Sequence, residues 1–196
     1  MIKFVCNQIF RLKGWSYDQN LPADLRSFVI VGAPHTSNWD FVPAMTLAYR
    51  SGLNAKFVIK NEWLRFPIGL VLKPIGAIGI DRSKIKSGAV KSSTDLMAHL
   101  FDDHKDICLM IAPEGTRSAT DEWKSGFWHI AHKASVPLAL AYADYKTKRA
   151  GVGLILQTSD FEKDMRTIMD FYRSVHPCHP DKFKLDHRYS SSIITS

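Results

Sequence analysis

Cysteine is scarce in this sequence, and repeats are absent. The 196 residues include 3 cysteines, Cys6, Cys108 and Cys178, which are far apart and odd in number. A disulfide framework is therefore not expected, and a reducing compartment is favoured. There is also no internal repeat, low-complexity tract or Ser/Gly-rich linker, which predicts a single domain over residues 1–196.

Long apolar runs are missing as well. No stretch reaches the roughly 18 uninterrupted apolar residues that a membrane-spanning helix needs. The richest candidate, residues 64–80, is broken by Arg65, Lys73 and two prolines. Asn7 and Gln8 interrupt the early apolar run, so no signal peptide is expected. We therefore expect neither an integral membrane protein nor a secreted one.

The composition is that of a folded globular protein with excess positive charge. Hydrophobic residues make up 45% and charged residues 23%, and the formal net charge is +7. Nucleic acid, an anionic lipid surface and an acidic carrier protein all fit that charge. The basic residues are scattered and form no recognition motif, so nucleic-acid binding is not expected.

Short apolar runs alternate with helical patterns along the chain. Strands are predicted at residues 28–33, 56–59, 75–80, 107–112, 137–142 and 152–157. Helices are predicted at residues 1–15, 39–51, 61–72, 87–104, 125–134 and 160–175, before an irregular tail at 176–196. This alternation predicts an α/β fold with a central, mainly parallel or mixed sheet flanked by helices. In such folds ligands collect beyond the carboxyl ends of strands.

A histidine and an aspartate follow the first predicted strand. In the segment HTSNWD, Asp40 lies five residues after His35 and can fold back to orient the imidazole of a general base. By itself this spacing is more typical of a loop histidine beside a helix-capping aspartate. His176 and Asp181 share the spacing, but they lie in a Pro-rich tail that follows no apolar strand.

Three further segments lie at strand ends or starts, and two of them carry charged residues. APEGTRS (residues 112–118) ends a strand, and Gly115 permits a tight turn while Arg117 offers a fork for phosphate or carboxylate. GAIGIDR (residues 76–82) is a strand that delivers Arg82 to a loop. VPLAL (residues 136–140) is a strand entry that alone indicates only core packing. Taken alone, the first segment favours a binding turn over a structural ion pair, whereas the Asp–Arg pair of the second is more often structural.

Together and in this order, the four segments resemble the glycerolipid acyltransferase family, which includes lysophosphatidate (1-acylglycerol-3-phosphate) acyltransferases. That family carries the blocks HxxxxD, GxIFIDR, FPEGTRS and VPIxP, and an FKxG-like element matches residues 123–126 here. The resemblance covers about residues 28–145 and implies a glycerol-phosphate acyltransferase-like fold. In length the chain is similar to the short bacterial-type members of the family. Gly79 and Ala112 replace usual phenylalanines and Leu140 a proline. The change at Gly79 is expected to reshape the acceptor pocket.

The resemblance implies how the reaction proceeds. His35 would take the proton from an acceptor hydroxyl as it attacks an acyl thioester, and Asp40 would orient His35. Backbone N–H groups near Gly115 would stabilise the oxyanion. The acceptor would be a lysophospholipid, 1-acylglycerol-3-phosphate first, giving phosphatidate in phospholipid biosynthesis. The remaining expected substrate-binding residues are Arg82, Glu114, Gly115, Thr116, Arg117 and Lys124.

No metal or tightly bound cofactor is expected, because the acyl-CoA or acyl-acyl carrier protein donor is a co-substrate. His129 and His132 lie on a predicted helix among core residues, which favours structural roles over metal ligation. The tail residues His176, Cys178 and His179 lack a fourth ligand at standard spacing, so no zinc site is predicted there.

Other functions stay open at this point. The acceptor could be a lipid without glycerol phosphate, or the protein could be a non-catalytic membrane-surface binding protein. A thioesterase could use the same base, although no Gly-x-Ser-x-Gly nucleophile turn is present.

The first helix also has two interpretations. On a helical wheel, Lys3, Asn7 and Arg11 form one stripe, opposite a broad apolar face. That face is formed by Ile2, Val5, Cys6, Ile9, Leu12 and Trp15. The helix could cover the core, or it could lie in an anionic lipid interface and place the enzyme peripherally on the cytoplasmic, inner face of the membrane. The second candidate for lipid contact comprises Trp63, Phe66, Pro67 and Leu70.

Overall fold

The chain folds around one mixed sheet in the computed structural model, which describes residues 1–80, 91–104 and 106–190. Within these residues, seven strands pair in the order β1-β7-β6-β2-β5-β3-β4. Their bounds are β1 (Ser16–Asp18), β2 (Phe28–Gly32), β3 (Ala55–Lys60), β4 (Ala77–Ile80), β5 (Cys108–Ile111), β6 (Leu138–Asp144) and β7 (Arg149–Leu156). The β6–β7 pair is antiparallel and the others are parallel. The predicted α/β fold is confirmed.

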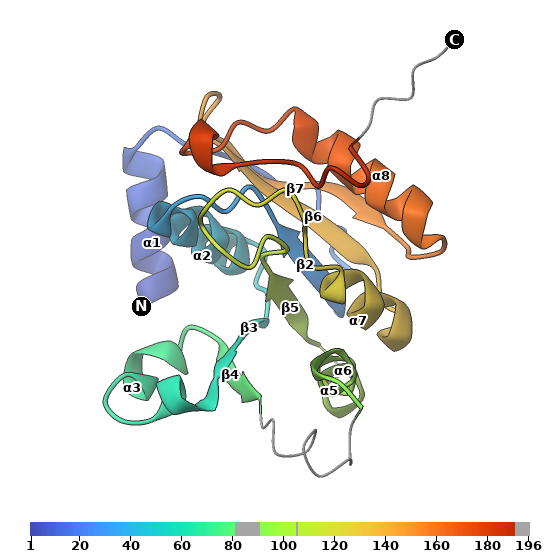
Figure 1. Cartoon of the computed structure of the whole chain (residues 1–196). Coiled ribbons are helices and arrows are strands. Elements are labelled where there is room, and N and C mark those ends of the chain that lie inside the picture. The colour runs from blue at the N-terminus through green and yellow to red at the C-terminus, as the bar shows by residue number, and fades with distance from the viewer. Residues whose placement is uncertain (81–90, 105, 191–196) are drawn as a thin grey trace.

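Helices cover both faces of the sheet. The α-helices are α1 (Ile2–Leu12), α2 (Phe41–Arg50), α3 (Gly69–Leu72), α5 (Ser93–Ala98), α6 (Leu100–Asp103), α7 (Gly126–Ala134) and α8 (Phe161–Arg173). The 3-10 helices are η1 (Asn38–Asp40), η2 (Asn61–Leu64) and η3 (Pro180–Lys182). Figure 1 shows α1 beside α2 on one side, with α7 and α8 on the other. None of the described helices has the length and apolar character needed to cross a bilayer.

The central strand β2 explains this layering. Its residues Phe28, Val29, Ile30 and Val31 are all fully buried, as expected of a parallel strand covered on both faces. Val29 and Val31 pack with residues of α7 and α8, whereas Phe28 and Ile30 pack with residues of α2. Because successive side chains of a strand point to opposite faces, this one strand contributes residues to both hydrophobic cores.

Most predicted elements are present, and the departures have physical causes. The predicted helix at 61–72 is wrong in its middle, because Pro67 separates η2 from α3. In the predicted helix at 87–104, α5 begins only at Ser93, capped by Ser92, and residues 87–90 lie outside the described residues. Strand β1 was not predicted, since three residues carry no periodicity.

The burial of helix α1 differs from that expected from its helical wheel. Cys6 and Phe10 are buried, and so is Asn7, whose side-chain oxygen accepts a hydrogen bond from Arg50 Nε of α2 at 2.8 Å. The predicted polar stripe is therefore wrong at Asn7, because its amide finds a polar partner on the neighbouring helix. The apolar face is divided as well, since Leu12 is 87% exposed. Helix α1 covers the core and also presents apolar side chains outward.

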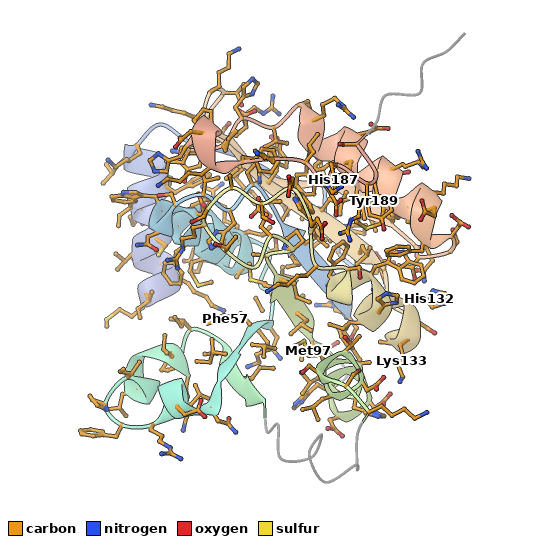
Figure 2. The ribbon with its side chains drawn as sticks, viewed as in Figure 1. Phe57, Met97, His132, Lys133, His187 and Tyr189 are labelled. Atoms are coloured by element: carbon orange, nitrogen blue, oxygen red, sulfur yellow. The ribbon has the colours of Figure 1, made fainter. Side chains whose placement is uncertain are left out.

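The described part of the tail, residues 176–190, is irregular apart from η3, yet it is packed. The His187 N–H donates to the Asp121 carbonyl oxygen at 3.0 Å, and the Tyr189 ring meets Phe161 edge-on at 5.7 Å. Figure 2 labels His187 and Tyr189 where they lie against the body of the domain. The described part of the tail is therefore part of the folded unit.

Candidate functional site

The sheet brings the two principal motifs together. Strands β2 and β5 are parallel neighbours, with Val31 opposite Ile111. Their carboxyl ends therefore meet at one edge of the sheet, where β2 leads into His35 and β5 leads into Glu114. The Glu114 carboxylate accepts the backbone N–H of His35, with N–O distances of 2.9 and 3.2 Å.

His35 and Asp40 form the predicted pair. His35 Nδ1 lies 3.2 Å from Asp40 Oδ2, and the two side chains are 29% and 10% exposed. Asp40 folds back because η1 begins with a capping box, in which Asp40 Oδ2 also accepts the N–H of Ser37 at 2.9 Å. Since Nδ1 faces the carboxylate, Nε2 is the ring nitrogen left to exchange a proton with a substrate.

Tyr145, at the end of the β6 segment, completes the support of Asp40. Its hydroxyl donates to Asp40 Oδ1 at 2.6 Å. Burial would raise the pKa of Asp40, but the hydrogen bonds from His35, Tyr145 and the Ser37 backbone outweigh burial and lower this pKa. Burial and the bond to Asp40 raise the pKa of Tyr145, which keeps its hydroxyl protonated as a donor. The aspartate is therefore a fully hydrogen-bonded anion.

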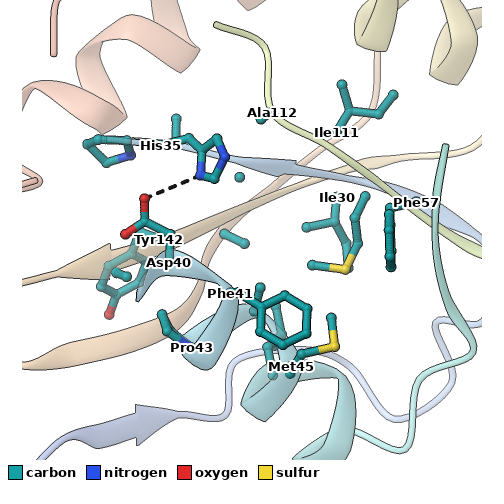
Figure 3. Close-up of a pocket in the computed structure, with 18 of the residues that line it drawn as sticks. Ile30, His35, Asp40, Phe41, Pro43, Met45, Phe57, Ile111, Ala112 and Tyr142 are labelled. Carbon is teal, nitrogen blue, oxygen red and sulfur yellow. Dashed lines mark ion pairs between the residues drawn. The ribbon is translucent and has the colours of Figure 1, made fainter. Parts of the chain in front are cut away.

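The pair lies in the wall of a pocket of about 740 Å³, a volume typical of ligand sites. Its polar lining residues include His35, Asn38, Asp40, Arg117 and Tyr142. The apolar lining includes Phe41, Met45, Phe57, Ile59, Leu72 and Ile75. Figure 3 shows His35 and Asp40 at one side of this pocket and Phe57 at the other. The pocket thus combines a proton acceptor with a long apolar surface.

The APEGTRS loop is shaped by its glycine. Gly115 has φ +66°, a backbone conformation that favours glycine, and a Cβ there would have to displace the flexible end of the Lys124 side chain. The Gly115 N–H donates to the Ala112 carbonyl oxygen at 3.1 Å. That donor is therefore occupied within the turn, and an oxyanion near Gly115 would need other N–H groups. Thr116, Arg117 and Lys124 are exposed, and Arg117 also lines the pocket.

One expected binding residue is buried, and another lies outside the described residues. Glu114 is 6% exposed and turned toward the His35 backbone, so its evident contact is with the loop that carries the base. Arg82 lies outside the described residues. Gly79 does not open a pocket, because a side chain there would collide with Asn61 and Leu64.

The described part of the tail contacts both the APEGTRS side of the site and the loop that carries His35. Asp186 is fully buried, accepts the Trp123 N–H at 2.8 Å and pairs with Arg188 at 2.7 Å. The His179 N–H donates to Thr36 Oγ1 at 3.2 Å. The tail is therefore bonded both to Trp123, next to Lys124, and to Thr36, next to His35. Neither contact could be found from motifs, since each joins residues distant in sequence.

The second histidine–aspartate spacing proves not to be a pair. His176 Nδ1 lies 2.9 Å from Asp144 Oδ2, so its partner is Asp144 rather than Asp181. Burial would raise the pKa of Asp144, but hydrogen bonds from His176 and Thr147 lower it to about 2. Within the described residues, no three His, Cys, Asp or Glu side chains are grouped as metal ligands.

The fold and site define an α/β protein with a histidine–aspartate pair opening on an apolar pocket. The family model described as Acyltransferase matches residues 16–141. The chain therefore belongs to the acyltransferase family, the glycerolipid acyltransferases that include 1-acylglycerol-3-phosphate acyltransferases, and is an acyl-transferring enzyme. Comparison with curated proteins and with solved structures gave no match.

Glu114 yields a prediction about stability and pH. Burial raises the pKa of Glu114 to about 7, although the hydrogen bond from the His35 N–H opposes this rise. In the unfolded chain a glutamate ionises near pH 4.3. Between these pH values the unfolded state loses its proton first, so native stability should fall as pH rises. Relative to Glu114→Gln, the unfolding free energy of the wild type should drop by up to about 3 kcal/mol between pH 4.5 and 7.

Urea unfolding of both proteins across this range measures the difference. Using the difference cancels the titration of other carboxylates. A difference that stays constant from pH 4.5 to 7.5 would show that Glu114 ionises normally in the folded protein.

Proposed function

We propose that the enzyme transfers a fatty acyl group from acyl-CoA or acyl-acyl carrier protein to a lysophospholipid-type acceptor, with 1-acylglycerol-3-phosphate giving phosphatidate. The observation that carries this proposal is the His35–Asp40 pair in the wall of the 740 Å³ apolar pocket. The pocket would hold the acyl chain, whose burial contributes about 0.8 kcal/mol per CH₂.

The proposed step is a direct transfer. His35 Nε2 takes the proton of the acceptor hydroxyl as its oxygen attacks the thioester carbonyl carbon. The tetrahedral intermediate collapses, the C–S bond breaks, and the thiolate leaves with the proton from His35. Asp40 stabilises the transient imidazolium, as in other base–carboxylate pairs. No metal or bound cofactor takes part in the proposed step, so activity should survive dialysis against a chelator.

Arg117 supports the acceptor assignment, because it lines the pocket together with His35 and a guanidinium suits a phosphate. We propose that Arg82, Thr116 and Lys124 complete the acceptor site and that the Gly115 turn positions Thr116 and Lys124. A lipid acceptor without phosphate would not need the positive charges of Arg82, Arg117 and Lys124. Arg82→Ala should then leave its acylation unchanged.

A panel of lysolipids tests the proposal. Purified protein is supplied with acyl-CoA or acyl-acyl carrier protein and each lysolipid, and products are identified by mass spectrometry. Phosphatidate from 1-acylglycerol-3-phosphate is the expected main product. Preferred acylation of an acceptor without phosphate would support the alternative acceptor class. Release of free fatty acid alone would indicate a thioesterase.

The pocket also predicts a dependence on acyl-chain length. Ala44 of α2 lines the pocket, so Ala44→Phe should fill part of it. We expect kcat/KM for a palmitoyl donor to fall about 100-fold, because each excluded CH₂ forfeits about 0.8 kcal/mol. A butyryl donor should be affected less than about 3-fold. Ala23→Phe, at an exposed position outside this pocket, is the matched control. Equal loss with both donors would place the acyl chain elsewhere.

We also propose that the enzyme works peripherally on an anionic membrane, on its cytoplasmic face. The exposed apolar side chains Leu12, Phe66 and Leu70 support this, together with the net charge of +7. A two-chain product cannot enter water cheaply, so a membrane route for release is favoured.

Vesicle sedimentation should show this association. We expect binding to anionic vesicles that weakens as salt rises from about 0.1 M to 1 M, because the Debye length falls from about 10 to 3 Å. The double variant Lys3→Glu with Arg11→Glu should bind anionic vesicles more weakly than the wild type at the same salt concentration. Equal recovery on neutral and anionic vesicles would contradict the electrostatic part of the proposal.

A further inference from the structure

A smaller cavity lies next to the histidine–aspartate pair, on the side of Tyr145. Its volume is about 240 Å³, and it is lined by the end of α1, the start of α2 and the β6–β7 turn. It shares Pro43 with the 740 Å³ pocket that is proposed to hold the acyl chain, here called the acyl pocket. His35 and Asp40 do not line the smaller cavity. Tyr145 forms one wall, and its hydroxyl reaches Asp40. The cavity is thus adjacent to the catalytic pair without being part of the reacting site.

Two lysines bring positive charge to this cavity. Lys13 Nζ lies 5.2 Å from the centre of the Trp39 ring, and Lys148 Nζ donates to the Lys13 carbonyl oxygen at 3.3 Å. Among the described residues, no carboxylate pairs with either ammonium, and no acidic side chain lines the cavity. Two lysines that line one cavity without a carboxylate partner among the described residues favour an anionic ligand.

The surroundings favour a lipid as the source of that anion. Trp15 and Tyr145 meet edge-on at 4.9 Å in the wall, and Trp39 is 55% exposed at the rim. Leu12 precedes Lys13 and is 87% exposed. Tryptophans gather at the headgroup level of bilayers, and lysines can extend their ammonium groups from apolar surface to phosphates. A soluble anion would gain nothing from these apolar neighbours.

We propose that this cavity binds the phosphate of an anionic membrane phospholipid between Lys13 and Lys148, as a site separate from the acyl pocket. This inference rests on the proposed membrane association and specifies where the membrane is held. The bound headgroup would bring the α1 surface and Trp39 into the interface. It would also contact the Tyr145 wall whose hydroxyl supports Asp40.

Paired charge removals test the site. Lys13→Gln with Lys148→Gln is compared with Lys163→Gln and Lys184→Gln, which removes the same charge at exposed positions elsewhere. Sedimentation uses phosphatidylcholine vesicles with and without phosphatidylglycerol. The cavity variant should bind the anionic vesicles about 30-fold more weakly, since each lysine near such a surface contributes about 1 kcal/mol. The control should change by less than about 3-fold. Equal losses in the two variants would overturn the site in favour of general charge attraction.

Two further readouts separate the possible failures. Phosphatidylglycerol with brominated chains should quench tryptophan fluorescence, and most of this quenching should disappear with Trp39→Phe. If inorganic phosphate at millimolar concentration displaces the vesicles, the cavity takes soluble phosphate and the lipid assignment is overturned. No turnover is measured, so the result stands whether or not 1-acylglycerol-3-phosphate is acylated. Wild-type protein that binds no vesicle would contradict the membrane association itself.

Discussion

Replacing His35 with alanine should abolish acyl transfer and leave a folded protein. The imidazole is the proton acceptor that the proposed reaction requires, and a positioned base contributes about 10²- to 10⁴-fold. Its side chain is 29% exposed and pairs with Asp40, while the contact to Glu114 uses the backbone N–H, which alanine keeps. We therefore expect kcat to fall at least 1,000-fold with little change in thermal unfolding. Mass spectrometry of the acylated product and circular dichroism measure the two quantities.

His176 provides a matched control within the same chain. It has the same spacing to an aspartate as His35, but it pairs with Asp144 and does not line the acyl pocket. His176→Ala should therefore keep activity within about 3-fold, at a modest cost in stability, because the buried Asp144 loses the imidazole but keeps the N–H groups of residue 176 and Thr147. Asp181→Asn should be close to silent. An inactive His176→Ala beside an active His35→Ala would place the catalytic centre elsewhere.

The fold could be predicted because its strands are buried on both faces. Parallel strands such as β2 form continuous apolar runs, which stand out in sequence more clearly than short or exposed strands. Strand β7 was predicted only from Val152, because its first residues include Arg149 and Gly151, which interrupt the apolar pattern. Strand β1 could not be predicted, since its three residues depend on pairing with β7.

The site could be predicted only where its parts are local or lie at strand ends. The pairing of Asp40 with His35 was expected from the four segments together and not from the spacing alone, which His176 and Asp181 share without pairing. The nearness of Glu114 follows from parallel strands that end at one edge of the sheet. Tyr145 could not be predicted, because 105 residues separate it from Asp40 and no motif includes it. The register of β6 on β2 brings that segment to the site. The role of Asp186 also depends on a tertiary contact, here with Trp123.

Asp40→Asn should have the second-largest effect. The carboxylate accepts four hydrogen bonds: from the N–H groups of Thr36 and Ser37 at 2.9 Å each, from His35 at 3.2 Å and from Tyr145 at 2.6 Å. An amide has one acceptor oxygen and brings an NH₂ donor, so it can satisfy only part of this set. It also removes the charge that stabilises the imidazolium.

We therefore expect Asp40→Asn to lower kcat by about 10²- to 10⁴-fold and stability by about 1–3 kcal/mol. Tyr145→Phe separates the effects, because it keeps the charge of Asp40 and removes only one hydrogen bond. It should lower kcat by about 10-fold with KM for both substrates nearly unchanged. It should also shift the pH dependence of kcat, which loss of packing alone would not do. Tyr49→Phe, at an exposed tyrosine of α2, is the matched control. If Asp40→Asn retained kcat within 3-fold, the aspartate would be a helix cap rather than the partner of a catalytic base.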